Sequence, residues 1–577
     1  MAYINNPNIM RKIFFISFIA IMSSYFTLSW GEGRGEVSLL PDTIVAFPGA
    51  EGFGKYTSGG RGGKVVYVTS LEDDANGEIE GTLRWAVKQY PDEPLTVCFA
   101  VTGEIRLVKD LRINRRNYTI AGQTAPGMGI VITHNKVNCG GSQNFIIRNI
   151  RFRIGRNDTN GNIITQNAFG AENCENFIID HCDFGWSTEE NMNTYDSHFI
   201  TVQYCIVHEG LNNSGHPKGA RGYGCQWGGS PASYHHNLLV NNNKRSCRFN
   251  GAQSNDYVVY LDYINNVQYN FEGGSNGCYG GENTAKLAEG EYNGLNSAHE
   301  CNFINNYYKA GPNTTNKKYF FSVEKARSGA TSWGPSQWYL DGNIFDGAAE
   351  VTADNWKGVT GKSPYDNTDT LRVDTLIRPA TPWWRWTADS IYGRYDFDSY
   401  AYAAGVYESA EGAFETVMDT VGCFPRDHVE KRLVQDTRNG STTYTGSKTG
   451  KKGIIDTEED AEGFYSYPSA DSFGFSLAAY DSDRDGMPDE WESANGCDPQ
   501  TPDNNVRHSS GYTMLEMYLD YAMTHKSPMD DGYKPSTEGV ESLEFKVESK
   551  KILRDGQLYI LRGERFFTLQ GGEVKLF

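Results

Sequence analysis

The sequence lacks several patterns that would place it in a common protein class. None of its 11 cysteines forms a Cys-x-x-Cys pair, which argues against zinc ribbons and thioredoxin-like chemistry. It has no excess of cationic residues, and its net charge of -19 argues against nonspecific binding to nucleic acid or anionic membranes. The apolar run at 13–22 follows Arg11 and Lys12 and is too short for a membrane span. It predicts an export signal over residues 1–31.

Helix signals are also scarce. In 577 residues we expect short helices mainly at 82–87 and 413–418. The 63 glycines suit a chain with many turns, and the share of hydrophobic residues, 38%, is typical of a folded protein. A chain of this length needs either several cores or one elongated repeat structure.

A short repeat occupies the middle of the chain. In each copy, β-type residues precede a polar pair, which often contains Asn or His, and an apolar residue follows. The copies end at Ile150, Cys182, Cys205, Leu238, Val267, Tyr307 and Ile344, in steps of 23 to 40 residues. Strands this short bury their apolar faces only by stacking coil on coil, with loops of variable length between them. The fold class predicted is all-β, a parallel β-helix.

Stacking assigns places to the repeated residues. The final residues from Ile150 to Val267 are expected to form an inner apolar ladder, with Cys182 and Cys205 as core residues before disulfide partners. The Asn of the polar pair suits a bend between strands, where it adopts a left-handed conformation.

Several ordered motifs carry a family resemblance. Residues 47–54 and 57–63 resemble the opening of bacterial pectate lyases of polysaccharide lyase family 1. Further blocks similar to that family follow in order at 119–127, 179–182, 216–219, 234–237, 425–427 and 438–440. The matches span roughly residues 46 to 520, and their order is more specific than any one of them. The resemblance implies a right-handed β-helix, in residues 42–430.

The resemblance implies β-elimination across a 4-linked galacturonan in pectate or pectin. Family members use calcium, an Arg that acts as the base and a Lys beside it; here Arg245 matches the Arg and Lys218 the Lys. Arg248 matches a second Arg, which binds a substrate carboxylate. Because positions 167, 190, 218 and 245 are 23, 28 and 27 residues apart, they are expected to stack on one face, about 5 Å apart.

The groove calcium ligands depart from the family pattern. The family's Asp thirteen residues before Asp180 is here Asn167, and either Glu189 or Glu190 matches the next acidic position. Cys247 replaces a common Pro. An Arg base also requires a lowered pKa, for which we expect a neighbouring cation and partial burial.

A second calcium signal lies downstream. Asp481, Asp483, Asp485 and Glu492 fit the loop pattern D-x-D-x-D-G-x5-E, which predicts a calcium ion that stabilises structure. The family's second Asp-rich loop, here at 504–510, has lost most of its acidic residues.

The remaining chain divides by composition. We expect a segment at 431–480 that wraps the β-helix, an EF-hand-like calcium region at 481–525 and a linker at 526–540. The tail, 541–577, alternates like two small strands and resembles C-terminal sorting tails of Bacteroidetes-type secretion systems. These features predict a monomer that is secreted or displayed at the cell surface after export through the periplasm.

Three functions compete. The first is a calcium-dependent pectate lyase, or a pectin lyase acting on methylated substrate. The second is a pectin-binding homologue with a weakened active site, motivated by Asn167 and Cys247. The third is a glycoside hydrolase, which would need two convergent carboxylates such as Asp180 and Asp183. The aromatic run 383–386 suits a sugar platform or cap packing.

Overall fold

The computed structural model describes residues 44–253, 259–272, 277–282, 299–324, 336–361, 368–377 and 408–525, and strands within 549–574. The predicted export signal (1–31), the linker (526–540) and the aromatic run 383–386 lie outside the described residues.

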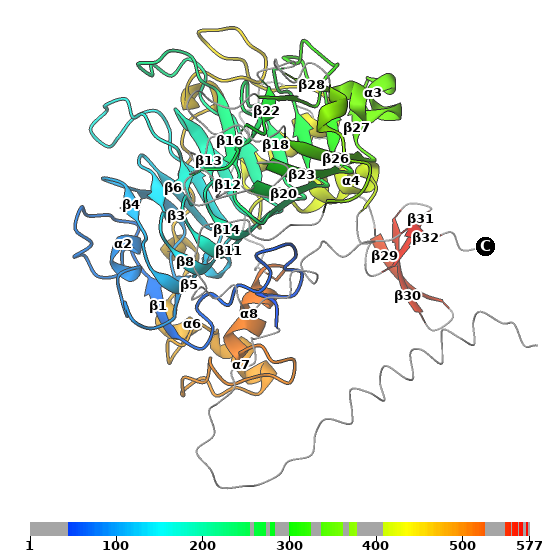
Figure 1. The fold of residues 1–577 in the computed structure, drawn as a ribbon. Helices are drawn as coiled ribbons and strands as arrows, with labels where there is room; N and C mark the ends of the chain where they lie inside the picture. The colour runs from blue at the N-terminus through cyan, green and yellow to red at the C-terminus, as the bar shows by residue number, and fades with distance from the viewer. Residues whose placement is uncertain are drawn as a thin grey trace, which may run out of the picture.

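Three sheets of parallel strands run along the fold (Figure 1). Sheet A consists of β1 (Lys64–Val68), β2 (Leu95–Phe99), β5 (Arg116–Ala121), β8 (Gln143–Arg148), β11 (Glu175–Asp180), β14 (His198–Gln203), β17 (Ala232–His235), β20 (Val259–Ile264), β23 (His299–Ile304) and β26 (Gln337–Asp341). Sheet B consists of β3 (Gly103–Arg106), β6 (Ile130–Thr133), β9 (Ile150–Arg153), β12 (Asp183–Gly185), β15 (Ile206–His208), β18 (Leu238–Val240), β21 (Val267–Tyr269), β24 (Tyr307–Lys309) and β27 (Ile344–Asp346).

Sheet C consists of β4 (Leu111–Arg112), β7 (Val137–Asn138), β10 (Phe169–Gly170), β13 (Glu190–Asn193), β16 (Tyr223–Trp227), β19 (Cys247–Phe249), β22 (Cys278–Gly280), β25 (Phe321–Val323) and β28 (Val359–Gly361). From β2 onward, each turn of the chain adds one strand to each sheet. This arrangement is the predicted parallel β-helix.

Identical positions of successive coils stack in the core. Phe145 and Phe177 pair across β8 and β11, and their ring centroids are 4.7 Å apart. Tyr118 continues the stack, 5.1 Å from Phe145. Burying one such side chain contributes roughly 1.5–3 kcal/mol. The repeat therefore stabilises the fold coil by coil.

The bend between sheets A and B has a left-handed residue in six successive coils, from β8 to β23. These residues have φ between 49° and 62°, and they are Asn149, His181, Tyr204, His236, Asn265 and Asn305. The predicted left-handed Asn is thus confirmed at Asn149. His181 and Tyr204 take its place in the next two copies, which have no Asn, and from Asn237 on the bend lies one residue before the Asn of the repeat.

This shift corrects the predicted apolar ladder. Ile150, Cys182 and Cys205 lie in the main core as expected, but Leu238 and Val267 lie on the outer face of sheet B. Leu238 pairs with Ile206, one residue beyond Cys205, so the repeat slips by one position at that step. Because side chains alternate between faces of a strand, one residue of slip moves the whole set outward.

Asparagines take the inner corner instead. The Asn237 side-chain oxygen accepts from the Cys205 amide at 2.9 Å, and the Asn237 amide group donates to Asn266 at 3.0 Å. Asn266 donates in the same way to Asn306, and Asn306 to Asn343. This asparagine ladder satisfies buried backbone groups at successive bends.

All 11 cysteines lie in the described part of the chain, and none is joined in a disulfide. Ten of them are buried, including Cys182 and Cys205, which serve as core residues as predicted.

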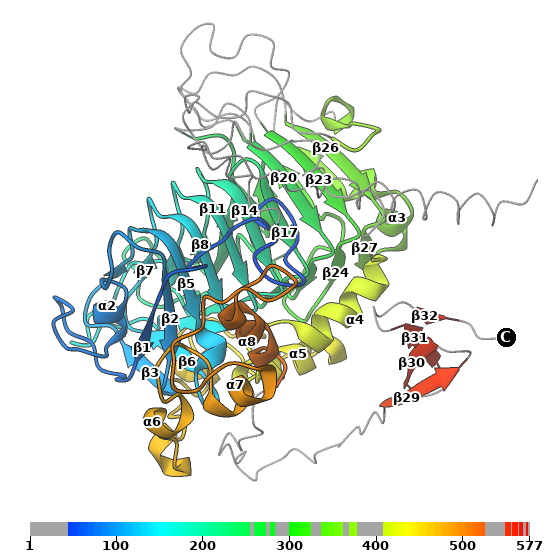
Figure 2. The ribbon, with the colours of Figure 1, turned by 90° about the horizontal axis from the view of Figure 1, so that it is seen from below.

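Short helices close the two ends of the coil stack. The predicted helix at 82–87 is confirmed as α2 (Leu83–Ala86), and Thr82 caps its N-terminus. Figure 2 places α2 at one end and α3 (Ala349–Ala353) at the other. Single turns of 3-10 helix occur at η1 (Gly122–Thr124), η2 (Asn355–Gly358), η3 (Thr368–Leu371), η6 (Glu458–Ala461) and η7 (Ala470–Phe473).

Two longer helices cover the outer face of sheet B. The helix predicted at 413–418 is confirmed as α4 (Ala410–Thr420), and α5 (His428–Asn439) follows it across the predicted boundary at residue 430. Their apolar faces pack on Leu238, Val267 and neighbouring residues.

A buried ionic network also joins α5 to the β-helix. The Arg153 guanidinium donates to Asp183 at 2.8 and 3.0 Å and to Asp427 at 2.6 and 3.2 Å. Asp427 also begins α5 through a capping box with Glu430, and Glu430 accepts from Arg151. Helix α5 is therefore held on the β-helix by both apolar packing and paired charges.

The last described part of the main body holds α6 (Leu477–Tyr480), α7 (Asp489–Asn495) and α8 (Met514–Ala522). Separately, β29 (Ser549–Arg554), β30 (Gln557–Arg562), β31 (Arg565–Thr568) and β32 (Glu573–Val574) form an antiparallel sheet. The two strands predicted for the tail are confirmed as β29 and β30, which form a hairpin.

Candidate active site and metal centre

Arg245 lies at the start of the turn into β19, and its backbone is left-handed, with φ 46°. Its Nε donates to the Tyr279 hydroxyl at 2.7 Å, and its guanidinium forms an ion pair with Glu190. The guanidinium also lies over the Tyr223 ring, 4.3 Å from the centroid. Three strands of sheet C, namely β13, β16 and β22, therefore position this one side chain.

The electrostatic surroundings of Arg245 are the reverse of those expected. Burial alone would lower its pKa, but the charge of Glu190 and the Tyr279 hydroxyl outweigh burial and raise the pKa. The sequence argument expected a neighbouring cation, whereas the coil register brings an anion to this place. In this conformation Arg245 is a firmly protonated group.

Arg248 follows on β19 and is buried in a second ion pair. It pairs with Glu282, and its Nη1 donates to Gln226 Oε1 at 2.9 Å. A substrate carboxylate that binds Arg248 must therefore compete with Glu282.

Lys218 occupies a different setting from the one its spacing suggested. It lies exposed in the loop between β15 and β16, where its amide donates to His216 Nδ1 at 3.0 Å. The residues in register with Glu190 are Tyr223 and Lys244, so Lys218 does not stack in that row. Loop length varies between coils, and residue spacing therefore fails to predict register here.

The carboxylates predicted to bind calcium near Arg245 form ion pairs with arginines. Glu189 lies 2.8 Å from His216 Nε2 and pairs with Arg221, while Glu190 pairs with Arg245. Because Phe169 pairs with Met192, Asn167 is in register with Glu190, as the spacing predicted. Their oxygens suit calcium by type, but both carboxylates are engaged by cations. As placed, the residues do not fit a calcium ion, because Glu189 and Glu190 already pair with arginines.

Motif reasoning missed Tyr223, Tyr279 and Glu282. Tyr223 lies between Arg221 and Arg245, at 4.5 and 4.3 Å from the two guanidinium carbons. No motif marks these residues, and the only sequence signal is their place near the strand that follows each repeat copy.

Asp180 and Asp183 are buried and ion-paired. Arg148 donates to Asp180, and Arg153 to Asp183, each at 2.8 Å. Burial raises the pKa of each carboxyl, but the neighbouring cations outweigh it and lower the pKa. A general acid needs a raised pKa and access to substrate. Neither carboxyl therefore supports the glycoside hydrolase hypothesis.

The downstream acidic loop forms a compact cluster. One carboxylate oxygen from each of Asp481, Asp483 and Asp485 lies within 4.8 Å of the others, and the same is true of Asp485, Glu492 and Asp503. Asp503 was not predicted; it lies just before the loop at 504–510. Sequence spacing could not find it, because Asp503 joins through the fold of the chain after α7.

The cluster has the chemistry of a cation site. Glu492 is fully buried, and neither of its carboxylate oxygens has a hydrogen-bond partner among the residues the structure describes. Burial and then the charges of Asp485, Asp483 and Asp481 raise the pKa of Glu492 to about 8. A calcium ion takes six to eight oxygen ligands, and a donor set of carboxylates fits it.

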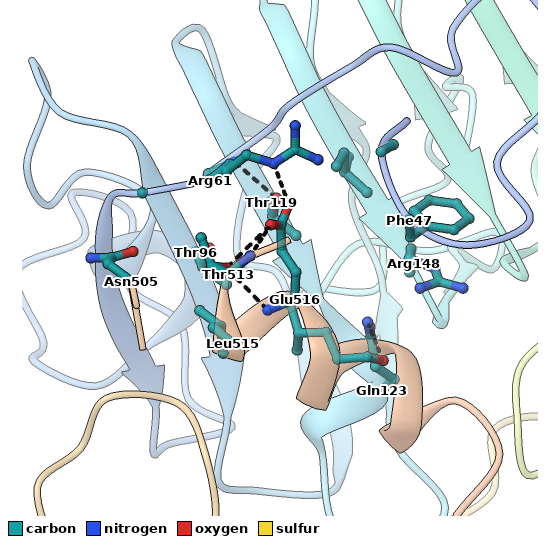
Figure 3. A pocket seen from close by; sticks show the side chains of 15 residues that line it. Phe47, Arg61, Thr96, Thr119, Gln123, Arg148, Asn505, Thr513, Leu515 and Glu516 are labelled. Atoms are coloured by element: carbon teal, nitrogen blue, oxygen red, sulfur yellow. Dashed lines mark hydrogen bonds and ion pairs between the residues drawn. The ribbon is translucent and has the colours of Figure 1, made fainter. Parts of the chain in front are cut away.

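The acidic loop is tied to the first strand of the β-helix. The Tyr67 hydroxyl of β1 donates to Asp481 at 2.6 Å. Nearby, Arg61 Nε donates to Glu516 of α8 at 2.6 Å, and Thr513 begins α8 through a capping box with Glu516 (Figure 3). The pocket drawn there holds only about 30 Å³, enough for ordered water and too small for a sugar unit.

Calcium is expected to stabilise this region measurably. At a calcium concentration of 100 times Kd, binding to the folded state alone contributes about 2.7 kcal/mol. We expect calcium to raise the Tm of the wild type by several degrees and EDTA to reverse the rise, as followed by scanning calorimetry.

The variant Glu492→Gln should lose this calcium response. The exposed neighbour Glu490 supplies the control, and Glu490→Gln should keep it. Equal responses in both variants would contradict the site.

The fold and site together define a parallel β-helix protein with arginines and tyrosines on the outer face of sheet C. No protein-family model matches the chain. It is 29% identical over 479 residues to a protein named probable pectate lyase C from Aspergillus fumigatus, covering 83% of this chain and 93% of the relative. The probable pectate lyase C of Emericella nidulans is 28% identical over 504 residues, covering 85% and 98%.

Among solved structures, Jun a 1, the major allergen from cedar pollen, matches with a TM-score of 0.41 and 16% identity. That match covers 65% of this chain and 92% of the allergen. This structural similarity is weak, and the fold is assigned from the parallel strand pairing of the three sheets. Within the described residues, no helix has the length and apolar character needed to cross a membrane.

Proposed function

We propose that the chain is a pectate lyase that cleaves 4-linked galacturonan by β-elimination. The observation that carries the proposal is the arrangement of Arg245 and Arg248 on sheet C. It occurs in a chain that is similar over 83% of its length to a protein named probable pectate lyase. Paired cations on an extended sheet suit a polymer with one carboxylate per sugar.

In this reaction the proton at C5 of one sugar is removed and the C4–oxygen bond breaks. The electron pair of the C5–H bond forms the C4–C5 double bond. The leaving oxygen departs with the electron pair of the C4–O bond. We assign the role of proton acceptor to Arg245, whose guanidinium is held in place by contacts with Tyr279 and Tyr223. Arg248 and Lys218 would bind substrate carboxylates and stabilise the charge that develops.

The raised pKa of Arg245 gives the reaction a pH dependence. Below that pKa, the neutral base form grows tenfold for each unit of pH. We therefore expect kcat to rise from neutral to alkaline pH. Glu190→Gln removes the charge that raises the pKa, so its profile should move to lower pH, whereas Glu189→Gln should not move it.

Rates at saturating polygalacturonate, followed across pH with each variant's stability checked, measure this shift. A Glu190→Gln profile that coincides with the wild type would show that Arg245 does not limit the rate.

Calcium is proposed chiefly at the downstream loop. Asp481, Asp483, Asp485 and Glu492, joined by Asp503, would hold one ion that stabilises structure. A second calcium ion at Asn167, Glu189 and Glu190 stays a prediction, since it would require the ion pairs of Glu189 with Arg221 and of Glu190 with Arg245 to open.

Finer features also belong to the proposal. The segment 1–31 and the tail strands support secretion or surface display through a Bacteroidetes-type system, with the mature protein a monomer. The curated relatives named above are fungal, so a bacterial origin rests on the sequence resemblance.

A pectin-binding homologue without activity is the second candidate. One observation favours it, because Glu190 and Glu282 already neutralise the two groove arginines.

Near-ultraviolet absorbance of polygalacturonate, with calcium and with chelator, separates the two. Elimination creates a conjugated double bond that absorbs there, and binding or hydrolysis does not. A rise in absorbance supports the lyase, and binding with no rise on pectate or methylated pectin leaves the binding protein.

A further inference from the structure

One row of side chains crosses sheet C on its outward face. Strand pairing places Arg248 beside Gln226, then Asn193, Gly170, Asn138 and Arg112. The residues immediately before these in the chain belong to the main core, namely Cys247, Cys225, Met192, Phe169, Val137 and Leu111. Side chains alternate along a strand, so the row points away from this core. Arg112 is exposed and Asn138 and Gln226 are partly exposed, whereas Arg248, Asn193 and Gly170 are buried.

The row is long and polar. Its five strand spacings span about 24 Å between the backbones of Arg248 and Arg112. Gly170 has no side chain, and Lys136 lies across it, since a Cβ there would be 2.9 Å from Lys136 Nζ. Two acidic groups lie beside the row: Glu172 accepts a hydrogen bond from Asn193, and Glu282 pairs with Arg248.

The row ends at a cationic hollow. The hollow measures about 780 Å³, and its charged lining consists of Lys88, Arg112, Arg115, Arg116, Asp92 and Glu93. Four cations thus face two anions, in a chain whose net charge is -19. In Figure 1, β4 lies beside α2 at the N-terminal end of the stack.

One arginine of the hollow holds the neighbouring loop in place, and two others carry charges that are not paired in the described part of the chain. Arg115 donates to the carbonyl oxygens of Val87, Gln89, Tyr90 and Glu93, which holds the loop after α2 in place. Arg112 and Arg116 are exposed, and neither forms an ion pair within the described residues. Their charges are therefore available to a ligand.

We propose that this hollow is a remote subsite for the polysaccharide. It would bind carboxylates of the same galacturonan chain whose bond is cleaved near Arg245, and in this respect it rests on the proposed function. The ligand is a polyanion because the hollow carries a local excess of cations. It is an extended polymer because the hollow lies about 24 Å from Arg248 along sheet C, a distance that only several linked sugars can span. Short oligomers cannot span both places.

The test uses Arg112→Gln/Arg116→Gln in the full chain. Arg106→Gln is the matched control, an exposed arginine of the same coil that lies on sheet B and pairs with Glu104. KM is measured on polygalacturonate and on trigalacturonate at low and at 0.5 M salt.

We expect the double variant to raise the ratio of polymer KM to trimer KM about fivefold, and salt to reduce this difference. The control should leave the ratio unchanged. An unchanged ratio in the double variant, or equal increases on both substrates, would overturn the subsite.

Retardation in native gels that contain polygalacturonate separates this inference from the proposed function. If the wild type shows no elimination but is retarded, and the double variant is retarded less, the subsite stands and the lyase proposal fails. If the wild type is active and both proteins are retarded equally, the subsite fails and the lyase proposal stands.

Discussion

Arg245→Ala is expected to lower kcat on polygalacturonate by about a thousandfold, because a positioned proton acceptor contributes between 10² and 10⁴ in rate. The side chain is held by Glu190, Tyr223 and Tyr279, so it meets substrate in one fixed orientation. The measurement is the initial rate of near-ultraviolet absorbance under saturating substrate.

Two companion variants make this result specific. Arg221→Ala removes the other cation that contacts the Tyr223 ring, at 4.5 Å, and should cost less than tenfold. Arg245→Lys keeps a positive charge but loses the planar guanidinium, so it should remain far below the wild type if Arg245 takes the proton.

Folding must be measured beside the rates, because removing Arg245 leaves Glu190 without its ion pair. A denaturant midpoint close to that of the wild type would show that the loss is chemical. A folded Arg245→Ala protein that retains wild-type kcat would place the base elsewhere in the groove.

Arg153→Met is expected to destabilise the protein by about 3–5 kcal/mol, because it removes the guanidinium that pairs with two buried carboxylates at once. Arg153 is 2% exposed and donates to both oxygens of Asp183 and of Asp427. The free energy of unfolding from urea titrations measures the effect. Helix α5 should detach first, since Asp427 caps it.

Arg156→Met provides the matched control three residues away. Arg156 is half-buried and donates to the exposed Glu459, so its loss should cost less than about 1 kcal/mol. Similar losses from both variants would mean that the buried network contributes no more than a surface pair.

Acid should reduce the difference between Arg153→Met and the wild type. Burial raises the pKa of Asp427, but the charges of Arg153 and Arg151 outweigh burial and hold that pKa well below its usual range. A carboxyl with a lowered pKa stabilises the fold above its unfolded pKa, near 3.9, and this contribution is lost as pH falls.

The sequence predicted the repeat well, because β-type residues recur once per coil whatever the loop lengths. It predicted the ladder only as far as Cys205. From Asn237 onward the inner corner is polar. Because the next residue, Leu238, is apolar, the sequence placed Leu238 in the core, which is wrong by one residue. Only the hydrogen bonds between adjacent coils reveal which of two neighbouring residues points inward.

The candidate site divides in a similar way. Arg245, just before β19, and Arg248, on that strand, belong to one sequence motif and could be named from the sequence. Their partners Glu190 and Glu282 lie 55 and 34 residues away. Such pairs depend on register. Residue spacing alone failed for Lys218, because this residue lies in a loop and not in the stacked row that its spacing predicted.

The unpaired cysteines have a consequence for the redox behaviour of the molecule. The thiolate is the form that reacts with oxidants and disulfides. Burial raises the pKa of Cys182 and Cys301 well above the usual value, so both stay as inert thiols at neutral pH. No disulfide therefore contributes to the stability of the described fold, and its buried thiols are protected from oxidants as long as the chain stays folded.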